Sequence, residues 1–448
     1  MYIELHDSFS FWSAQSLRWN EWGGPQQAVL HGRLPVDLNE APALLGKPIC
    51  VYARQGRPAW WGYVDEVQAR LAKVTVRWRL EDMANRCAPL QRLQDAPPFG
   101  RPWQPGPWQE DRRSQARFGV RERLLHSGEA APPTWPPGQY RPQQRGTATG
   151  LCLIGRGWLE TLTWRTAVEL ETRPECTQPG GVLQTLDWPL AQELLLLEEQ
   201  HPAAIWLRAA QTGATGPLLA QLCQDSSGQP GNPLASAELL PTQVSSAVTW
   251  QRVPLPPSQA LPCGSRAWLC LSGSPAWRVE VNEAAPVSAG SLWRADGSGW
   301  AKRLPEAALL FSLESQWDAR RLLEKIGSLA GQFLSGWQTE LNPLLTFQPP
   351  SAVLTYADLL KELCALANAQ ALVTPERILR LRPHSACAER SLGPDGRVYD
   401  ANGQLLSLDS GLAGHPLRLS QSQLPAMRCT AAHWQPGKPT AEPVFTKL

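Results

Sequence analysis

The sequence predicts a mainly β protein with some α+β structure, organised in several domains. Short segments that alternate apolar and polar residues recur along the chain and are separated by Gly or Pro. The 448 residues also include 42 Pro and 21 Trp. Proline stops helices, whereas tryptophan suits half-buried sheets and interaction surfaces. Together these observations favour a β-rich protein that binds something large.

The N-terminal part predicts a small antiparallel β domain over residues 15–79. Residues 80–93 place apolar side chains on one stripe and predict a short helix. The next segment, 94–110, is rich in proline, so we expect extended chain without regular structure. Strands are expected again over 149–157 and 159–170.

Residues 178–314 contain short strands with turn residues between them, a pattern typical of a β-sandwich. The stretch QDSSGQPGNPLASAEL within this region, 224–239, predicts a strand-to-strand reversal. Gly228 and Gly231 can supply positive φ there. A metal or sugar site in this loop is the alternative to a plain hairpin tip.

The last third of the chain predicts mixed α+β structure. A helix, a strand, a second helix and a hairpin are expected in turn over 317–331, 333–341, 355–370 and 371–383. Thr355 is the expected N-cap of the second helix, with Asp358 completing a capping box. The tail from residue 385 is only weakly strand-like.

The composition argues against several classes of protein. Only 18% of the residues are charged and the net charge is +2, which favours neither disorder nor a nucleic-acid partner. The 10 Cys form no CxxC pair and the 7 His form no i, i+4 pair, so we expect neither a metal site nor a cofactor. The chain has no ordinary signal peptide pattern and no apolar run of about 18 residues, so no membrane segment is expected.

Catalytic patterns are also missing from the sequence. It has no GxSxG, HExxH, Walker or complete GxGxxG motif. The acid pairs Asp65–Glu66 and Glu81–Asp82 are adjacent in sequence, whereas glycoside hydrolysis needs carboxyl groups that face each other across a substrate. We therefore expect no catalytic residue and no enzyme activity.

Tryptophans in the sandwich region are the candidate binding residues. Trp206 and Trp268 lie in strongly apolar strands and are expected in the core. Trp277, Trp293 and Trp300 lie near Gly, Ser, Asp and Asn, where loops carry function. A flat indole face can stack on the apolar face of a sugar ring, so these three are possible glycan-binding residues. Partial burial under a loop or a subunit contact is the alternative.

The order of these segments resembles the baseplate or tail-tip hub proteins of long-tailed bacteriophages. The resemblance is carried by AWWGYVDEVQARLAKVTVRWRLEDMANR, DRRSQARFGVRERLL, GRGWLETLTWR and TYADLLKELCALANAQALVTPERILRLRP, at 59–86, 111–125, 155–165 and 355–383. The intervening region resembles a jelly-roll, carbohydrate-binding-like module inserted into phage structural proteins. This second likeness is carried by Asp225, Gly228, Pro230, Gly231, Leu234, Ser236, Trp250, Val253, AWLCLSG at 267–273 and LLFSL at 309–313.

The resemblance implies two tail-tube-like β-barrel hub domains that assemble as a homotrimer. The implied domains are a first hub β domain at 1–93, a Pro-rich connector with a short helix at 94–146, strands returning to the hub at 147–177, the inserted sandwich at 178–314, a second hub α+β domain at 315–384 and a C-terminal extension at 385–448.

The expected function is therefore structural. The chain would form a ring that joins the tail tube to the tip of the virion, after synthesis in the host cytoplasm. Its expected partners are further copies of itself, tail-tube, distal-tail and tail-tip proteins, and a host-surface glycan on the outward sandwich. A lectin-like host-recognition protein is the first alternative, and a cell-wall glycosidase is the second.

Overall fold

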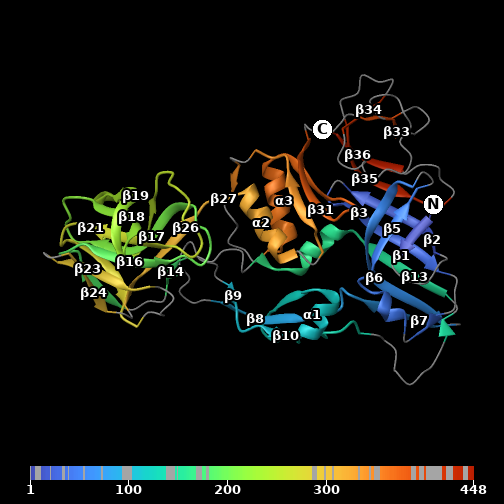
Figure 1. Ribbon diagram of the computed structural model, residues 1–448, viewed down its shortest axis with the longest axis horizontal. Coiled ribbons are helices and arrows are strands. Elements are labelled where there is room, and N and C mark those ends of the chain that lie inside the picture. Colours follow the sequence, from blue (N-terminus) through green and yellow to red (C-terminus); the bar gives the residue numbers. More distant parts are fainter. Residues whose placement is uncertain are drawn as a thin grey trace.

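The computed structural model shows a mainly β protein with several sheets, as predicted. The structure describes residues 2–5, 12–20, 22–32, 36–38, 40–53, 56–71, 74–92, 103–137, 147–148, 150–167, 174–177, 181–284, 290–296, 299–304, 307–330, 333–342, 345–347, 354–384, 390–392, 398–399, 416–419, 427–436 and 442–447. Figure 1 shows a β-sandwich at one end, two helices in the middle and a large sheet at the other end. We call everything outside the sandwich the body.

The large sheet of the body contains twelve strands among the described residues. Its main path runs β1 (Tyr2–Leu5), β5 (Pro48–Tyr52), β6 (Pro58–Leu71), β13 (Gly150–Arg156), β3 (Gly24–Gly32), β2 (Trp12–Asn20), β35 (Met427–Trp434), β34 (Pro416–Leu419), β32 (Arg390–Leu392) and β33 (Val398–Tyr399). Two more strands pair with this path, β7 (Val74–Arg79) with β6 and β36 (Glu442–Lys447) with β35. The strand order explains why distant parts of the chain form one unit, because β13 lies between β6 and β3 and β35 returns to β2.

Smaller sheets and helices complete the body. The short strands are β4 (Val36–Asp37), β8 (Arg86–Arg92), β9 (Trp103–Pro105), β10 (Gln109–Glu110), β11 (Glu122–Leu125), β12 (Thr147–Ala148), β27 (Trp317–Asp318), β28 (Gly336–Thr339), β29 (Thr346–Phe347), β30 (Ala369–Val373) and β31 (Ile378–Pro383). The helices are α1 (Arg112–Phe118), α2 (Ala319–Ala330) and α3 (Tyr356–Leu366), with 3₁₀ turns η1 (Ala41–Leu44) and η2 (Trp158–Trp164). No helix in the described ranges is long and apolar enough to cross a membrane.

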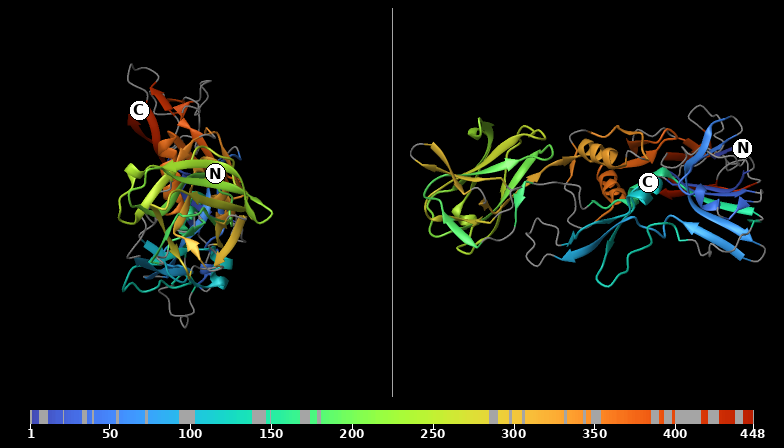
Figure 2. Two further views of the ribbon diagram at one scale, coloured as in Figure 1. Left: turned by 90° about the vertical axis from the view of Figure 1, so that its left-hand side faces the viewer. Right: turned by 60° about the horizontal axis from the view of Figure 1, so that its bottom comes forward.

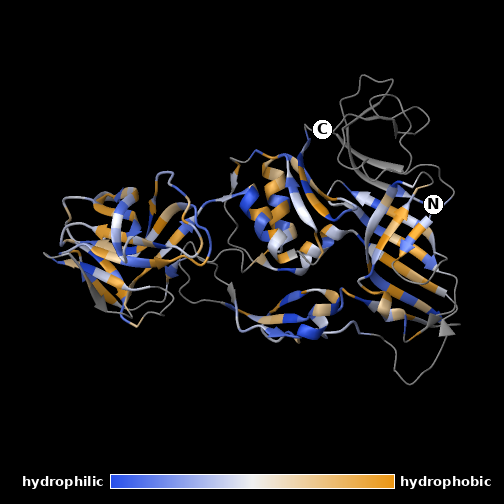
Figure 3. Cartoon of the chain, viewed as in Figure 1, coloured by the Kyte–Doolittle hydropathy of each residue, from blue (hydrophilic) through white to orange (hydrophobic). Residues whose placement is uncertain are grey.

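One hydrophobic core holds the body together. It joins the large sheet to η2, α2, α3 and the β30–β31 hairpin. The indole of Trp61 on β6 donates a 2.8 Å hydrogen bond to the carbonyl of Val373 on β30. Buried and part-buried residues alternate along β5 and β13, so one face of each of these strands enters this core, whereas β6 is buried on both faces. Figure 3 shows apolar residues on the strands of this sheet that it colours. The N-terminal and C-terminal parts that were expected as two hub halves thus share a core.

The sandwich consists of two packed sheets with a second core of their own. The first sheet contains β14 (Glu175–Cys176), β15 (Val182–Thr185), β17 (Pro202–Gln211), β20 (Thr249–Pro254), β22 (Trp277–Asn282), β25 (Ala308–Leu309) and β26 (Phe311–Ser315). The second sheet runs β19 (Gln229–Leu239), β18 (Leu218–Ser226), β21 (Arg266–Ser272), β16 (Leu190–Leu195), β23 (Leu292–Asp296) and β24 (Gly299–Leu304). A short 3₁₀ turn, η4 (Pro241–Gln243), lies between β19 and β20.

A small polar joint connects the sandwich to the body, and the right-hand view of Figure 2 shows the two as separate masses. Arg321 on α2 donates to the carbonyl oxygen of Glu199 at 2.9 Å and to Ser315 Oγ at 2.8 Å. Its guanidinium carbon lies 4.1 Å from the ring centroid of Trp317. Lys325, one turn further along α2, forms an ion pair with Glu198.

Several local predictions are confirmed. Helix α3 begins at the predicted N-cap, where Asp358 N donates to Thr355 Oγ1 and Thr355 N donates to an Asp358 carboxylate oxygen. The segments 317–331 and 333–341 contain α2 and β28, and β30 and β31 form the predicted antiparallel hairpin. The stretch 224–239 is a hairpin with Ser227 and Gly228 at its tip, both at positive φ.

Four local predictions are wrong. Residues 80–93 form a turn followed by β8 rather than a helix, because Pro89 cannot sit in a helix interior and β8 pairs with β10 and β11. Residues 158–164 form η2 rather than a strand, since the Thr161 hydroxyl bonds back to the Trp158 carbonyl at 2.7 Å.

The other two errors concern proline and glycine. The segment 94–110 does contain strands, β9 and β10, which are short enough to pair with β8 despite the prolines around them. Gly231 lies within β19 and is not among the positive-φ glycines, because the two-residue tip at Ser227 and Gly228 is sufficient to reverse the chain.

Candidate functional site

An aromatic stripe crosses the outer face of the second sheet of the sandwich. Its residues come from β16, β18, β21, β23 and β24, and side chains on this face point away from the main sandwich core. We define the outer stripe as Ala191, Cys223, Trp268, Cys270, Trp293 and Trp300. Strand pairing places these residues together, because Ala191 lies opposite both Cys270 and Trp293, and Cys223 lies opposite Trp268.

Trp268 forms the floor of the outer stripe. It is fully buried, and its indole donates a 2.8 Å hydrogen bond to Asp225 Oδ1. Trp293 packs edge-to-face against it, with ring centroids 5.5 Å apart and an interplanar angle of 86°. Trp293 and Trp300 are half-buried, so each keeps part of its surface in contact with solvent. The Trp293 Nε1 atom is buried and has no hydrogen-bond partner in the described part of the chain.

Polar groups border the stripe. Glu193 accepts a hydrogen bond from the backbone of Ser291 at 3.1 Å and forms an ion pair with Arg266 at 3.0 Å. On the other side, Gln221 donates to Ser236 Oγ at 3.0 Å. An aromatic surface with hydrogen-bonding groups at its edge is what binding of a saccharide requires, since the rings stack and the polar groups set orientation.

Two thiols lie within the stripe, and a hydrogen bond joins their side chains. This bond, together with burial, raises the pKa of the Cys270 thiol well above its ordinary value, whereas the same bond lowers the pKa of the Cys223 thiol. Cys270 is therefore protonated and inert, because only a thiolate is a strong nucleophile or metal ligand. No group of three His, Cys, Asp or Glu side chains within the described ranges is arranged to hold a metal ion.

The three predicted tryptophans do not lie together. Trp293 and Trp300 belong to the outer stripe. Trp277, on β22, is 0% exposed and packs in the main core of the sandwich, where its indole donates to the Gly216 carbonyl at 2.9 Å. Trp277 therefore cannot present a ring face to a sugar. Of the two predicted core residues, Trp268 is buried in the stripe and Trp206 is only half-buried.

Sequence reasoning did not single out Trp188. This residue precedes β16, is 44% exposed, and has the Arg294 guanidinium carbon 5.9 Å from its ring centroid. Its sequence context, LDWPL, does carry a usable signal, since Asp and Pro around a Trp indicate a loop at the end of a strand.

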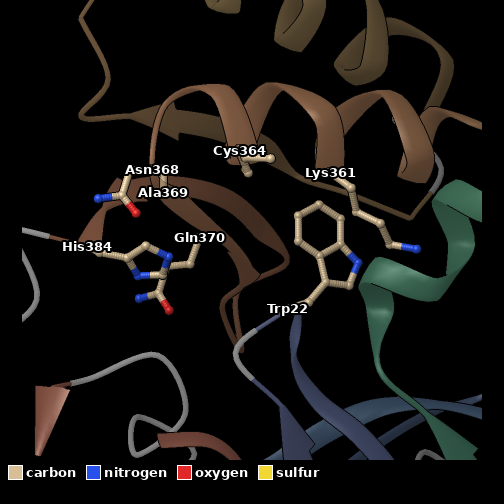
Figure 4. A pocket seen from close by; sticks show the side chains of 8 residues that line it. Trp22, Lys361, Cys364, Asn368, Ala369, Gln370 and His384 are labelled. Carbon is tan, nitrogen blue, oxygen red and sulfur yellow. The ribbon is translucent and has the colours of Figure 1, made fainter. Parts of the chain in front are cut away.

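A second candidate is a cavity of about 380 Å³ in the body, shown in Figure 4. It lies beneath α3, with the Trp22 indole on one side and His384 and Gln370 on the other. The Lys361 Nζ atom lies 5.8 Å from the Trp22 ring centroid. Burial raises the pKa of Cys364 above this cavity to about 12, so its thiol is inert.

Comparisons with known proteins are sparse. No protein-family model matches the chain, and no curated protein matches it. Among solved structures, a carbohydrate-binding module from Clostridium stercorarium in complex with cellobiose is 13% identical and covers 24% of this chain and 83% of its own, at a TM-score of 0.16.

Two further structures match over longer stretches. The mosquito-larvicidal Cry4Aa toxin from Bacillus thuringiensis is 10% identical, with 60% of this chain and 51% of the toxin covered, at a TM-score of 0.18. Infectious bursal disease virus, Gx strain, is 10% identical, with coverage of 69% and 72% and a TM-score of 0.13. TM-scores this low establish no shared fold.

Proposed function

We propose that this chain is a structural subunit of a bacteriophage tail tip, a baseplate hub that forms a homotrimeric ring between the tail tube and the tip of the virion. The proposal rests on one observation. The four segments whose sequences resemble hub proteins, 59–86, 111–125, 155–165 and 355–383, all contribute to the single core of the body. The sandwich, which lies between the third and the fourth segment in the chain, has its own core and stands apart.

Specific contacts join these four segments. Trp61 of the first bonds to Val373 of the fourth at 2.8 Å. Arg121 of the second stacks on Trp164 of the third, with its guanidinium carbon 3.7 Å from the ring centroid. The third and fourth also meet where Tyr356 N donates to the Arg165 carbonyl at 3.2 Å. The sandwich therefore interrupts the body in the chain but folds around its own core. We expect this arrangement of an accessory domain that is inserted into a hub.

The test is assembly of the purified full chain. Native mass spectrometry and negative-stain imaging, with and without tail-tube protein, are expected to show a trimer that caps the tube. A chain that stays monomeric with tube protein present would contradict the proposal. Lysis of purified host cell wall by the chain would favour a glycosidase instead.

A second candidate function, glycan binding by the sandwich, is favoured by the outer stripe. We expect the full chain to bind a host-surface glycan on an array and Trp293→Ala to lose that binding. Trp250→Ala is the matched control, because Trp250 is also half-buried but lies opposite Arg208 on the other sheet. Binding by neither the wild type nor the control would reject this function while leaving the hub proposal standing.

A further inference from the structure

A polar cavity of about 230 Å³ lies in the body, away from the sandwich and from the cavity beneath α3. Tyr63 and Asp65 on β6 form part of its wall, Arg121 lies just before β11, and Arg156 ends β13. Glu81, Glu160 and Trp164 complete the part of the lining that matters for recognition.

Arg121 is the unusual residue of this cavity. The residue is 6% exposed, and its Nη1 atom is buried without a hydrogen-bond partner among the described residues. None of the ion pairs within 4 Å in that part of the chain involves Arg121. Its guanidinium instead stacks on the Trp164 ring at 3.7 Å. A buried cation without a hydrogen-bonded anion is costly, because burial removes its hydration.

Glu122, the residue after Arg121, is also buried but has several partners. The side chain of Glu122 is 2% exposed, and its carboxylate contacts Arg86, Arg165 at 2.9 Å and both the backbone N and hydroxyl of Thr166. The missing partner of Arg121 is therefore a local feature of this cavity. It is not a general property of the packing.

A second orphaned donor belongs to a residue in the wall of the same cavity. Tyr63 is 1% exposed, and its phenol oxygen is buried without a hydrogen-bond partner in the described chain. Its ring packs at 82° against Trp164, with the ring centroids 5.2 Å apart. Arg121 is held equally firmly, because its backbone N donates to Asn85 Oδ1 at 2.8 Å and its carbonyl accepts from Asn85 N at 3.0 Å.

We propose that this cavity binds a carboxylate, whose oxygens accept hydrogen bonds from the Arg121 guanidinium and the Tyr63 hydroxyl. The planar guanidinium matches a carboxylate in a two-point contact. Arg156, with its Nε 3.8 Å from the Asp65 carboxylate, adds positive charge at the wall. Arg123 and four acidic residues, Asp65, Glu81, Glu122 and Glu160, also line this space. A dianion such as phosphate therefore meets more repulsion from the carboxylates than a singly charged carboxylate does.

The carboxylate has two sources that share this chemistry, a free small molecule and an acidic side chain of a neighbouring copy of the chain. The test uses the full chain with acetate as the probe, at constant ionic strength set with chloride. Acetate is expected to raise the melting temperature of the wild type in a saturable way, because a ligand that binds only the native state stabilises it. Phosphate is expected to have a much smaller effect.

Variants separate recognition from folding. Arg121→Gln is expected to weaken acetate binding at least about tenfold, as loss of a charge-assisted hydrogen bond does. Tyr63→Phe removes a hydroxyl without a partner, so it is expected to fold normally and still bind acetate several-fold more weakly. Arg77→Gln removes an exposed arginine from the neighbouring strand β7 and is expected to bind like the wild type.

The oligomeric state of the protein shows which of the two sources supplies the carboxylate. If a neighbouring copy supplies the carboxylate, acetate dissociates the wild-type oligomer and Arg121→Gln fails to form it. If the ligand is free, assembly is unaffected and acetate binding by the monomer persists. The proposal is overturned if acetate changes neither melting temperature nor assembly, if phosphate binds in place of acetate, or if Arg121→Gln and Tyr63→Phe both bind acetate like the wild type.

Discussion

Replacing Asp65 by asparagine is expected to stabilise the body at neutral pH. Burial raises the pKa of Asp65 from 3.8 to about 6, and the attraction of Arg121 and Arg156 only partly offsets this rise. The native state therefore holds the proton more tightly than the unfolded chain does. The stability gained in this way is complete below about pH 4 and is lost as the pH rises through about 6.

The pKa shift of Asp65 sets the expected size of the stability difference. A pKa difference of about two units corresponds to about 3 kcal/mol of unfolding free energy, at roughly 1.4 kcal/mol per unit. An asparagine at this position would resemble the protonated aspartate at every pH. The difference in stability between Asp65→Asn and the wild type is thus expected to be near zero at pH 4 and to reach about 2–3 kcal/mol at pH 8.

Urea denaturation followed by tryptophan fluorescence at several pH values measures this difference. The sandwich has its own core, and its unfolding transition serves as an internal reference that the substitution does not shift. Asp82→Asn, which removes an exposed carboxyl in the loop after β7, is the control for loss of a negative charge. A stability difference that is constant from pH 4 to pH 8, or that favours the wild type at pH 8, would refute the reasoning.

Three further predictions concern packing and the joint. Gly119→Ala is expected to cost about 1–3 kcal/mol more than Gly46→Ala in urea denaturation, because both glycines have φ near 78° but only at Gly119 would the new methyl collide with the Phe333 ring. Thr355→Ala removes the N-cap of α3 and is expected to cost about 1 kcal/mol by the same measurement. Arg321→Ala is expected to speed limited proteolysis between sandwich and body without lowering the melting temperature of either, and equal cleavage rates would contradict the role given to that joint.

Local chemistry explains which parts of the fold could be predicted. The β30–β31 hairpin and α3 follow from strong nearby signals, among them the capping box of Thr355 and Asp358. Strand β16 was missed, because its sequence LAQELL does not alternate apolar and polar residues. Residues 158–164 were misassigned because threonine is common in strands but can also bond back to the chain, as Thr161 does here to the Trp158 carbonyl.

Long-range pairing limited the prediction of the sites. Side chains alternate between the two faces of a strand. In β22 this alternation turns Trp277 into the sandwich core, and in β23 it turns Trp293 to the outer face. The sequence alone does not show which of the two faces is the inner one. The unpaired state of Arg121 likewise emerges only when β6, η2 and the start of β11 are brought together. The return of β35 to β2 joins residues more than 400 positions apart in sequence, and no local pattern near Leu17 or Trp434 indicates it.

Imaging an assembled tail tip at side-chain resolution tests the central proposal most directly, because it fixes both copy number and neighbours. The proposal predicts three copies of this chain in one ring, with the body against the tail tube and the sandwich on the outside. Copies placed singly at the periphery, attached through the body with only the sandwich facing the host, would contradict the hub and favour a host-recognition protein.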